Sequence, residues 1–289
     1  MGQAIAEQPR NRHALIGRST ALDRRISAVR PDLTDVRLAG SVFAPHYAAA
    51  MLQTASSIIA IRETPDPASA VVSEVLPGET FEMLELSEQV AWGIGTADGV
   101  VGYADAVRLQ DFAAPTHRVT AIAGRLREAP DANAAVLATL PAGARLAALG
   151  ERDAFLLTDH GYIAGADVAA LDAPTGTVGP VAARLVGVPA RAGGRSGAGV
   201  DSAGLVFLAH DLCGVRVPRF TDLQATTLGI AVPDPDMARV GDVWFFADHA
   251  AILISPDAAI HVVDRVREVP CTALLAGDHG PVLARRRIA

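Results

Sequence analysis

Short apolar runs broken by proline and glycine turns fill the middle of the chain. Thr80-Phe81-Glu82-Met83-Leu84 is a run of this kind and is typical of a β-strand. The pattern occurs twice, because Arg62-Glu63-Thr64-Pro65-Asp66 is similar to Arg127-Glu128-Ala129-Pro130-Asp131, and residues 98–105 are similar to residues 160–167, about 62–65 positions later. A repeated unit of about 60 residues with short strands predicts two small β-barrels in succession.

The last third of the chain follows a different pattern. Four apolar residues recur at three-to-four spacing and predict a helix that begins near Asp201: Leu205, Leu208, Ala209 and Leu212. Three apolar runs follow with turns between them, at residues 241–246, 248–254 and 259–263. Strands that succeed one another after a helix favour an α+β fold with an antiparallel sheet packed on helices.

These patterns divide the 289 residues into four segments. Residues 1–55 are polar and mixed in character, and we expect an N-terminal arm that lies across another domain. The two repeats predict domains at residues 56–112 and 113–172. A linker rich in proline and glycine then leads into a last domain at residues 173–289.

Charge and composition restrict the partners and the compartment. The net charge of −7 and the absence of a basic stripe argue against a nucleic-acid partner, and the three arginines at 285–287 are expected to form a solvated tail. No secretion signal begins the chain, and no run reaches the ~18 apolar residues that span a bilayer, so we expect no membrane partner. Two cysteines are too few for a disulfide scaffold, which favours a cytoplasmic protein.

The candidate chemistry lies in the last segment. A glycine-rich loop leads into the predicted helix, whose first residue after Asp201 is Ser202. A helix N-terminus stabilises a thiolate and is a common position for a cysteine nucleophile, whereas a serine hydroxyl is not ionised there. His249 and His261 fall on neighbouring predicted strands, where a hairpin brings their rings to one site. Cys213 falls near the far end of the helix and is expected to be a buried structural residue. No zinc-type spacing or phosphate loop is present, so we expect no metal and no cofactor.

These motifs resemble those of the NlpC-type cell-wall peptidases, a compact papain-like family of cysteine peptidases. The matching motifs are Gly199-Val200-Asp201-Ser202-Ala203-Gly204-Leu205-Val206, Gly241-Asp242-Val243-Trp244-Phe245-Phe246, His249-Ala250-Ala251-Ile252 and His261. The repeated units resemble bacterial SH3-like domains, which precede the peptidase domain in some members of that family. The resemblance implies two SH3-like β-barrels followed by a papain-like NlpC-type domain.

The resemblance also implies site residues. In that family a cysteine at position 202 attacks an amide, His249 transfers the proton, and His261 orients His249. Ala190, Ala192, Asp201 and Ala203 would belong to the substrate-binding side. The family has a cysteine, a tyrosine and a tryptophan where this chain has Ser202, Ala190 and Ala192. The family substrate is a peptidoglycan peptide, cut between D-γ-glutamate and a diamino acid.

Two main hypotheses follow from these departures. The first is a catalytically inactive homologue that binds a peptidoglycan-derived peptide or a protein partner, or serves as a scaffold. The alternative is an active peptidoglycan-peptide hydrolase in which Ser202 is either an engineered replacement of cysteine or a working serine nucleophile. A purely structural protein, in which His249 and His261 only fill the sheet, is a third possibility.

Overall fold

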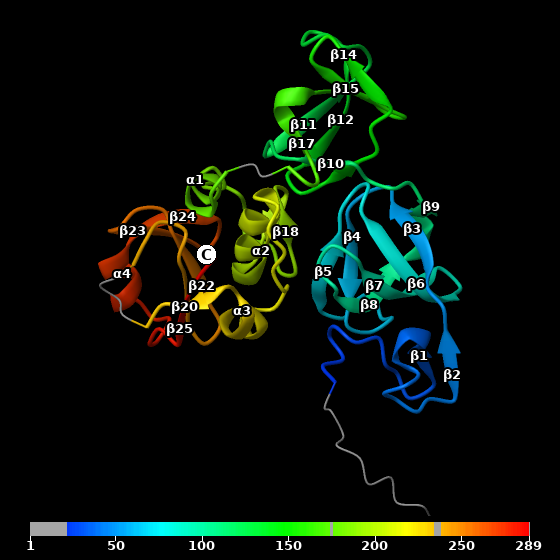
Figure 1. The fold of residues 1–289 in the computed structure, drawn as a ribbon, viewed down its shortest axis with the longest axis horizontal. Coiled ribbons are helices and arrows are strands. Elements are labelled where there is room, and N and C mark those ends of the chain that lie inside the picture. The colour runs from blue at the N-terminus through cyan, green and yellow to red at the C-terminus, as the bar shows by residue number, and fades with distance from the viewer. Residues whose placement is uncertain (1–21, 174–175, 234–237, 289) are drawn as a thin grey trace, which may run out of the picture.

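The computed structural model describes residues 22–173, 176–233 and 238–288. Three groups of elements are visible along the chain (Figure 1). They are an N-terminal β unit with its preceding segment, a second β unit, and a C-terminal unit of helices and strands. No helix among the described residues has the length and apolar character needed to cross a membrane.

The first β unit is a seven-stranded sheet of order β5-β4-β8-β7-β6-β3-β9 with antiparallel pairs throughout. Its elements are β3 (Met51–Ala55), β4 (Ile59–Arg62), β5 (Val71–Val75), β6 (Thr80–Ser87), β7 (Val90–Gly95), β8 (Val101–Asp105), the 3-10 helix η2 (Ala106–Arg108) and β9 (Leu109–Asp111). The sheet therefore begins at Met51, within the segment that the sequence assigned to the arm. Apolar residues such as Ile61, Phe81 and Val100 form its core.

The second β unit repeats these strand pairings. Its elements are β10 (His117–Val119), β11 (Ala123–Arg127), β12 (Val136–Pro141), β13 (Arg145–Leu146), β14 (Gly150–Arg152), β15 (Phe155–Thr158), β16 (Gly161–Ala164), η3 (Gly165–Asp167) and β17 (Val168–Ala170). The order β12-β11-β16-β15-β14 matches β5-β4-β8-β7-β6, and β13-β10-β17 matches β6-β3-β9. The counterpart of β6 is thus divided into β13 and β14. The shared pairing agrees with the internal repeat seen in the sequence.

The described part of the N-terminal segment packs on the first β unit. It contains β1 (Leu33–Asp35), the 3-10 helix η1 (Val36–Leu38) and β2 (His46–Ala48), with β1 and β2 parallel. Ala28 is buried in one cluster with Trp92 and Leu84, and the Arg30 guanidinium lies 4.4 Å from the centre of the Trp92 ring. Apolar burial and a cation–π contact therefore hold this segment in place. Residues 1–21, the start of the expected arm, lie outside the described residues.

The C-terminal unit is built on a six-stranded antiparallel sheet of order β20-β25-β21-β22-β23-β24. Its strands are β20 (Ile230–Ala231), β21 (Val243–Phe245), β22 (Ala250–Leu253), β23 (Ala258–Val262), β24 (Val266–Pro270) and β25 (Ala284–Arg287), and a separate hairpin joins β18 (Arg195–Ser196) to β19 (Gly199–Val200). Its helices are α1 (Val178–Ala183), α2 (Ser202–Leu212), α3 (Thr221–Thr227) and α4 (Cys271–Ala276). The antiparallel sheet and the helix after Asp201 agree with the α+β expectation.

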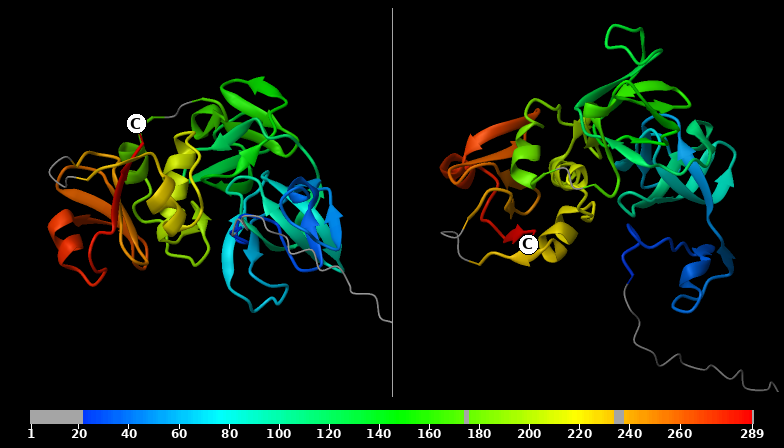
Figure 2. Two further views of the ribbon diagram at one scale, coloured as in Figure 1. Left: turned by 60° about the horizontal axis from the view of Figure 1, so that its bottom comes forward. Right: turned by 45° about the horizontal axis from the view of Figure 1, so that its top comes forward.

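Alternating residues of this sheet enter two different cores. Ala250, Ile252 and Ile260 share a cluster with buried residues of α1 and α2, whereas Ala251 and Leu253 share one with residues of α4. The two-residue period of a strand explains the division, because successive side chains point to opposite faces. In both views of Figure 2, α2 lies between this sheet and the two N-terminal β units.

The expectation of a solvated tail at 285–287 is wrong. These residues belong to β25, which pairs with β20 and β21 inside the sheet. The Arg287 guanidinium donates to both carboxylate oxygens of fully buried Asp242, at 2.6 Å each. An arginine can cover apolar surface with its stem and pair with a carboxylate, so a run of arginines can form a strand when such a partner is near.

Buried charge joins the C-terminal unit to both β units. Arg195 of β18 is 1% exposed, and its guanidinium lies 3.0 Å from a carboxylate oxygen of Glu79 and 2.9 Å from one of Asp98. On the second β unit, Arg118 donates to the carbonyl of Asp211 at 2.8 Å. Arg195 belongs to the hairpin before α2 and Asp211 belongs to α2 itself, so the β units pack against that hairpin and against the helix that begins at Ser202.

Candidate active site

Ser202 is the first residue of α2, and Asp201 is the N-cap of the helix. The Oδ1 atom of Asp201 accepts a hydrogen bond from the Gly204 N–H at 2.7 Å, as an N-cap side chain does. Its Oδ2 atom accepts from the Gly193 N–H at 3.1 Å and from Arg219 at 2.6 Å. Both oxygens of Asp201 are therefore engaged in holding the helix start and the preceding loop.

The two predicted histidines lie on one face of the sheet. His261 is in β23 directly opposite Ala251 of β22, and His249 is two residues before Ala251. The period of two places His249 and Ala251 on the same face, so the rings become neighbours. Ser202 Oγ lies 3.0 Å from His249 Nδ1, and His249 Nε2 lies 3.0 Å from His261 Nδ1. The structure thus brings together Ser202, His249 and His261 as the sequence predicted.

Burial controls the electrostatics of this chain of hydrogen bonds. Both histidines are 8% exposed. Burial, together with the nearby His279 and His261 imidazoles, lowers the pKa of His249 to about 4. Burial, His279 and the Arg267 guanidinium also lower the pKa of His261. Desolvation disfavours the charged imidazolium, so His249 is neutral and its Nδ1 can either accept a hydrogen bond from the Ser202 hydroxyl or donate one to it.

His279 is a further member of the site that the sequence analysis missed. It follows α4 in the turn Gly277-Asp278-His279-Gly280, and its ring stacks on that of His249 with 3.9 Å between centroids and 3° between planes. One ligand nitrogen from each of His249, His261 and His279 can be chosen so that all three lie within 4.8 Å of one another. Neither periodicity nor spacing indicated that His279 lies beside His249, because its position depends on how α4 packs. The composition of the turn does not report that packing.

The remaining predicted site residues have different surroundings. Ala190 and Ala192 are exposed in the loop before β18, and the Ala190 N–H donates to the Asp264 carbonyl at 2.9 Å. Ala203 is buried, and its carbonyl accepts a hydrogen bond from Gln224 at 3.0 Å. These three side chains offer only methyl groups.

Cys213 is a free, buried residue at the C-cap of α2, at the opposite end from Ser202. Burial raises the pKa of its thiol to about 11. A thiol that stays protonated at neutral pH is a poor nucleophile, so Cys213 does not replace the missing sulfur.

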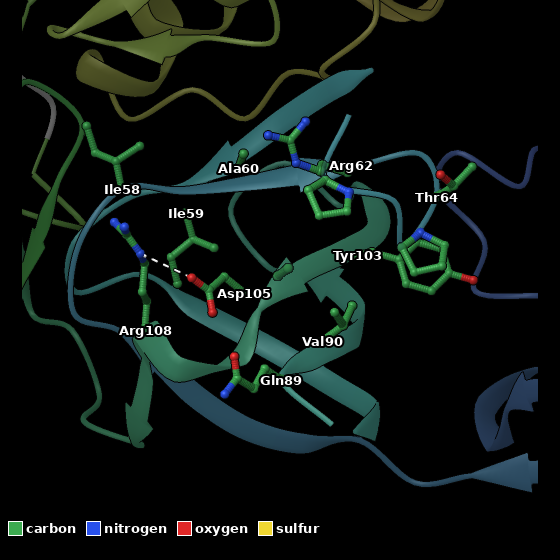
Figure 3. A pocket seen from close by; sticks show the side chains of 13 residues that line it. Ile58, Ile59, Ala60, Arg62, Thr64, Gln89, Val90, Tyr103, Asp105 and Arg108 are labelled. Carbon is green, nitrogen blue, oxygen red and sulfur yellow. Dashed lines mark hydrogen bonds and ion pairs between the residues drawn. The ribbon is translucent and has the colours of Figure 1, made fainter. Parts of the chain in front are cut away.

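The first β unit carries a second candidate binding region. A pocket of about 490 Å3 lies beside β4 and β8 and is lined by apolar residues such as Ile59 and by Arg62, Tyr103, Asp105 and Arg108. Figure 3 shows these side chains around the cavity, with Arg108 and Asp105 joined by an ion pair. The Tyr103 ring, the Arg62 guanidinium and the apolar lining suit a small ligand that carries a carboxylate, whereas Arg108 is already paired with Asp105.

Comparisons with known proteins support the fold. The family model of the bacterial dipeptidyl-peptidase SH3 domain matches residues 61–107. An NlpC/P60 family protein from Bacillus cereus ATCC 10987 has an 18% identical sequence and a TM-score of 0.70, over 82% of this chain and 99% of its own. An NlpC/P60 endopeptidase from Photobacterium damselae subsp. piscicida is 12% identical with a TM-score of 0.52, over 82% of this chain and 71% of its own. No curated protein sequence matches this chain. The chain therefore has the NlpC/P60 fold and carries a bacterial SH3 domain.

Proposed function

We propose that this chain is a catalytically inactive homologue of the NlpC/P60 peptidoglycan hydrolases that binds a peptidoglycan-derived peptide or scaffolds a protein partner. The single observation that carries this proposal is a hydroxyl, Ser202 Oγ, 3.0 Å from His249 Nδ1 at the start of α2. A cysteine there would share its proton with the imidazole before the reaction. A serine has to lose its proton in the transition state, which demands a stronger base and a complete oxyanion hole.

The partners of His249 argue against such a base. In serine hydrolases a buried carboxylate orients the histidine and stabilises the imidazolium that forms. Within the described chain, the hydrogen bonds of the His249 ring go to Ser202 and His261, and neither partner is a carboxylate. Ala190 offers no polar side chain where the resemblance implied a tyrosine. Each missing oxyanion donor costs about 3–4 kcal/mol of transition-state stabilisation.

Two features support binding. The exposed Ala190 and Ala192 leave the loop before β18 open, since a methyl group fills far less space than an aromatic ring. The pocket beside β4 and β8 supplies the Arg62 guanidinium and the Tyr103 ring. Guanidinium groups pair with carboxylates, which γ-D-glutamyl-diamino-acid peptides carry. The related structures are named for NlpC/P60 proteins, including an endopeptidase.

Domain organisation and location form part of the proposal. We assign residues 113–172 as a second SH3-like domain, supported by the strand pairings that it shares with residues 56–112. We place the chain in the cytoplasm, because Cys213 and Cys271 are both free and buried, as in a reducing compartment. Cell fractionation with an antibody to this chain tests the location, and recovery from the culture medium or the cell wall would contradict it.

The decisive experiment measures hydrolysis and binding of γ-D-glutamyl-diamino-acid peptides by the native chain, Ser202→Ala and Ser202→Cys. We expect no turnover by the native chain, and calorimetric binding that Ser202→Ala leaves unchanged within about threefold. Tyr103→Ala then reports whether the pocket of the first β unit holds the peptide. Turnover by Ser202→Cys alone would show that the site around Ser202 still recognises substrate and lacks only sulfur.

The second candidate function is an active hydrolase, favoured by the unbroken hydrogen-bond chain from Ser202 through His249 to His261. Turnover by the native chain that Ser202→Ala abolishes would establish it and contradict our proposal. A cysteine codon at position 202 of the natural gene would identify the serine as an engineered replacement.

A further inference from the structure

We propose that His249, His261 and His279 form a binding site for one zinc ion or a similar late transition-metal ion. Ligand nitrogens from the three rings lie within 4.8 Å of one another, and the first two rings are buried. Three imidazoles are a donor set that suits zinc, copper and nickel, whereas magnesium and calcium prefer oxygen ligands. This inference goes beyond the proposed function, because metal binding requires neither a peptide nor turnover.

The spacing of the two buried rings suits a tetrahedral ion. Zinc binds imidazole nitrogen at about 2.0–2.1 Å, so two ligand nitrogens of a tetrahedron lie about 3.3–3.4 Å apart. His249 Nε2 and His261 Nδ1 are 3.0 Å apart. If these two nitrogens moved apart by a few tenths of an ångström, an ion could take the place of the proton that they share. The lone pairs of both nitrogens would then point at the ion.

Ser202 supplies the outer support that a ligating histidine needs. Ligating imidazoles usually donate their second ring N–H to another group, which fixes the tautomer and the ring orientation. Ser202 Oγ lies 3.0 Å from His249 Nδ1, so it can accept that N–H while His249 Nε2 faces the ion. A hydroxyl can donate or accept a hydrogen bond, so Ser202 can accept the N–H of a ligating His249. Serine in place of cysteine at position 202 weakens the peptidase chemistry but is compatible with metal binding.

His279 must turn to complete the site. A metal lies near the plane of the imidazole that binds it, and the planes of His249 and His279 are parallel, so the stacked rings cannot share one ion. His279 is only half-buried and sits in a turn, next to Gly280, where an added Cβ would meet nothing within 4 Å. Rotation of this ring toward His261, whose centroid is 5.6 Å away, brings in the third nitrogen.

The charges near the cluster allow a cation. Arg267 is the cationic side chain whose charge acts on His261, and it is paired with Asp264 at 2.7 Å. The pair offsets the repulsion between the guanidinium and a bound ion. Three neutral imidazoles leave a fourth tetrahedral position for water.

The test titrates Zn2+ into the metal-free full-length chain against a chromophoric chelator, in the absence of any peptide. We expect one ion per chain. His279→Phe keeps a ring that can stack on His249 but removes the ligand nitrogen. It should weaken Zn2+ binding by at least the ~10–100-fold that is typical for loss of a residue that hydrogen-bonds to a ligating histidine. His46→Phe, at an exposed histidine of β2, is the matched control and should bind as the native chain does. Co2+ should give intense visible absorption with the native chain and lose it in His279→Phe.

A second variant helps to distinguish the loss of a metal ligand from the loss of the fold. His261→Gln should weaken binding as much as His279→Phe, with circular dichroism and melting recorded for every variant. Equal Zn2+ affinity of the native chain and a folded His279→Phe would overturn the proposal, as would equal losses in His46→Phe and His279→Phe. Because no peptide is present, these outcomes are independent of whether the chain binds or cleaves one.

Discussion

Histidine has two different physical roles in this chain. His249, His261 and His279 lie together beside Ser202. His210 lies apart from them in the last turn of α2 and is fully buried. Its Nδ1–H donates to the Val206 carbonyl at 2.7 Å, and its Nε2 has no hydrogen-bond partner. A buried imidazole of this kind stays neutral, because charging it would leave an unpaired cation in the core.

We predict that His210 makes the C-terminal unit sensitive to acid. Burial lowers the pKa of His210 from 6.5 to about 4. Above pH 6.5 neither the folded nor the unfolded chain holds this proton, so the full stability is present. As the pH falls from 6.5 toward 4, only the unfolded chain binds the proton, and the free energy of unfolding falls by up to about 3 kcal/mol.

Urea unfolding between pH 7 and pH 4 measures this effect, with Trp244 fluorescence recorded in a Trp92→Phe background. His210→Leu is the comparison, since it lacks the titrating group and fills a similar volume. The stability of the native chain should decline relative to that of His210→Leu over this pH range. Parallel stability curves for the two proteins would contradict the prediction.

The sequence indicated part of the site, and the reason differs from residue to residue. Ser202 was predictable because a glycine-rich loop, an N-cap and a helix are local signals. His249 and His261 were predictable because one hairpin sets their register. His279 was not, since its position depends on how α4 packs and where the following turn leads. Arg287 was misread because its partner, buried Asp242, is 45 residues away.

Among the elements, the start of α2 depends on close approach to the preceding loop. Gly204, in the first turn of the helix, faces the carbonyl oxygen of Gly194, and an added Cβ would lie 1.9 Å from that oxygen. Gly193, beside it, has a φ of 70°, a conformation that favours glycine. The loop and the helix can therefore approach only while Gly204 lacks a side chain, whereas a Cβ on Gly193 would meet Val71 of β5 at 2.6 Å.

We predict that Gly204→Ala destabilises the chain, although glycine-to-alanine changes inside helices usually stabilise by about 1 kcal/mol. The new methyl group meets a backbone oxygen that is held by the Asp201 N–H at 3.1 Å, so the loop has to move at a cost of about 1–3 kcal/mol. Chemical denaturation measures the change. Gly150→Ala, where nothing lies within 4 Å of the added Cβ, should be near neutral. A stabilising effect of Gly204→Ala would show that the loop yields freely.

The two β units show what an internal repeat can predict. Asp66 and Asp131 each accept a hydrogen bond at 2.8 Å from the N–H two residues ahead, in the turns that the sequence repeat marks. Arg62 and Arg127 each donate to a carbonyl seven residues later, Ser69 at 2.6 Å and Ala134 at 2.7 Å. The two β units therefore share the side-chain hydrogen bonds of these turns as well as their strand order. The division of one long strand into β13 and β14 has no such local signal.

At the scale of the whole molecule, the units meet through apolar contacts, such as Phe220 against the core of the first β unit, and through buried polar contacts that hydrophobic periodicity does not detect. Arg195 lies between three acidic residues of the first β unit: Glu74, Glu79 and Asp98. On its other side the guanidinium lies 5.1 Å from the centre of the Phe207 ring of α2. The side chains of Arg195, Glu79 and Asp98 are at most 2% exposed. A charge pair at this depth is sensitive to the loss of either partner, because the remaining charge stays buried.

We predict that Arg195→Met uncouples the first β unit from the C-terminal unit. The substitution keeps an apolar stem but leaves Glu79 and Asp98 without their cation, at a cost of about 3–5 kcal/mol. Calorimetry should show one transition for the native chain and separate transitions for the variant. Arg152→Met removes an exposed arginine of β14 and should change stability by less than about 0.5 kcal/mol. Adding Glu79→Gln to Arg195→Met should recover part of the loss, since one unpaired buried charge is then gone. An unchanged single transition in Arg195→Met would show that apolar contacts alone hold the units together.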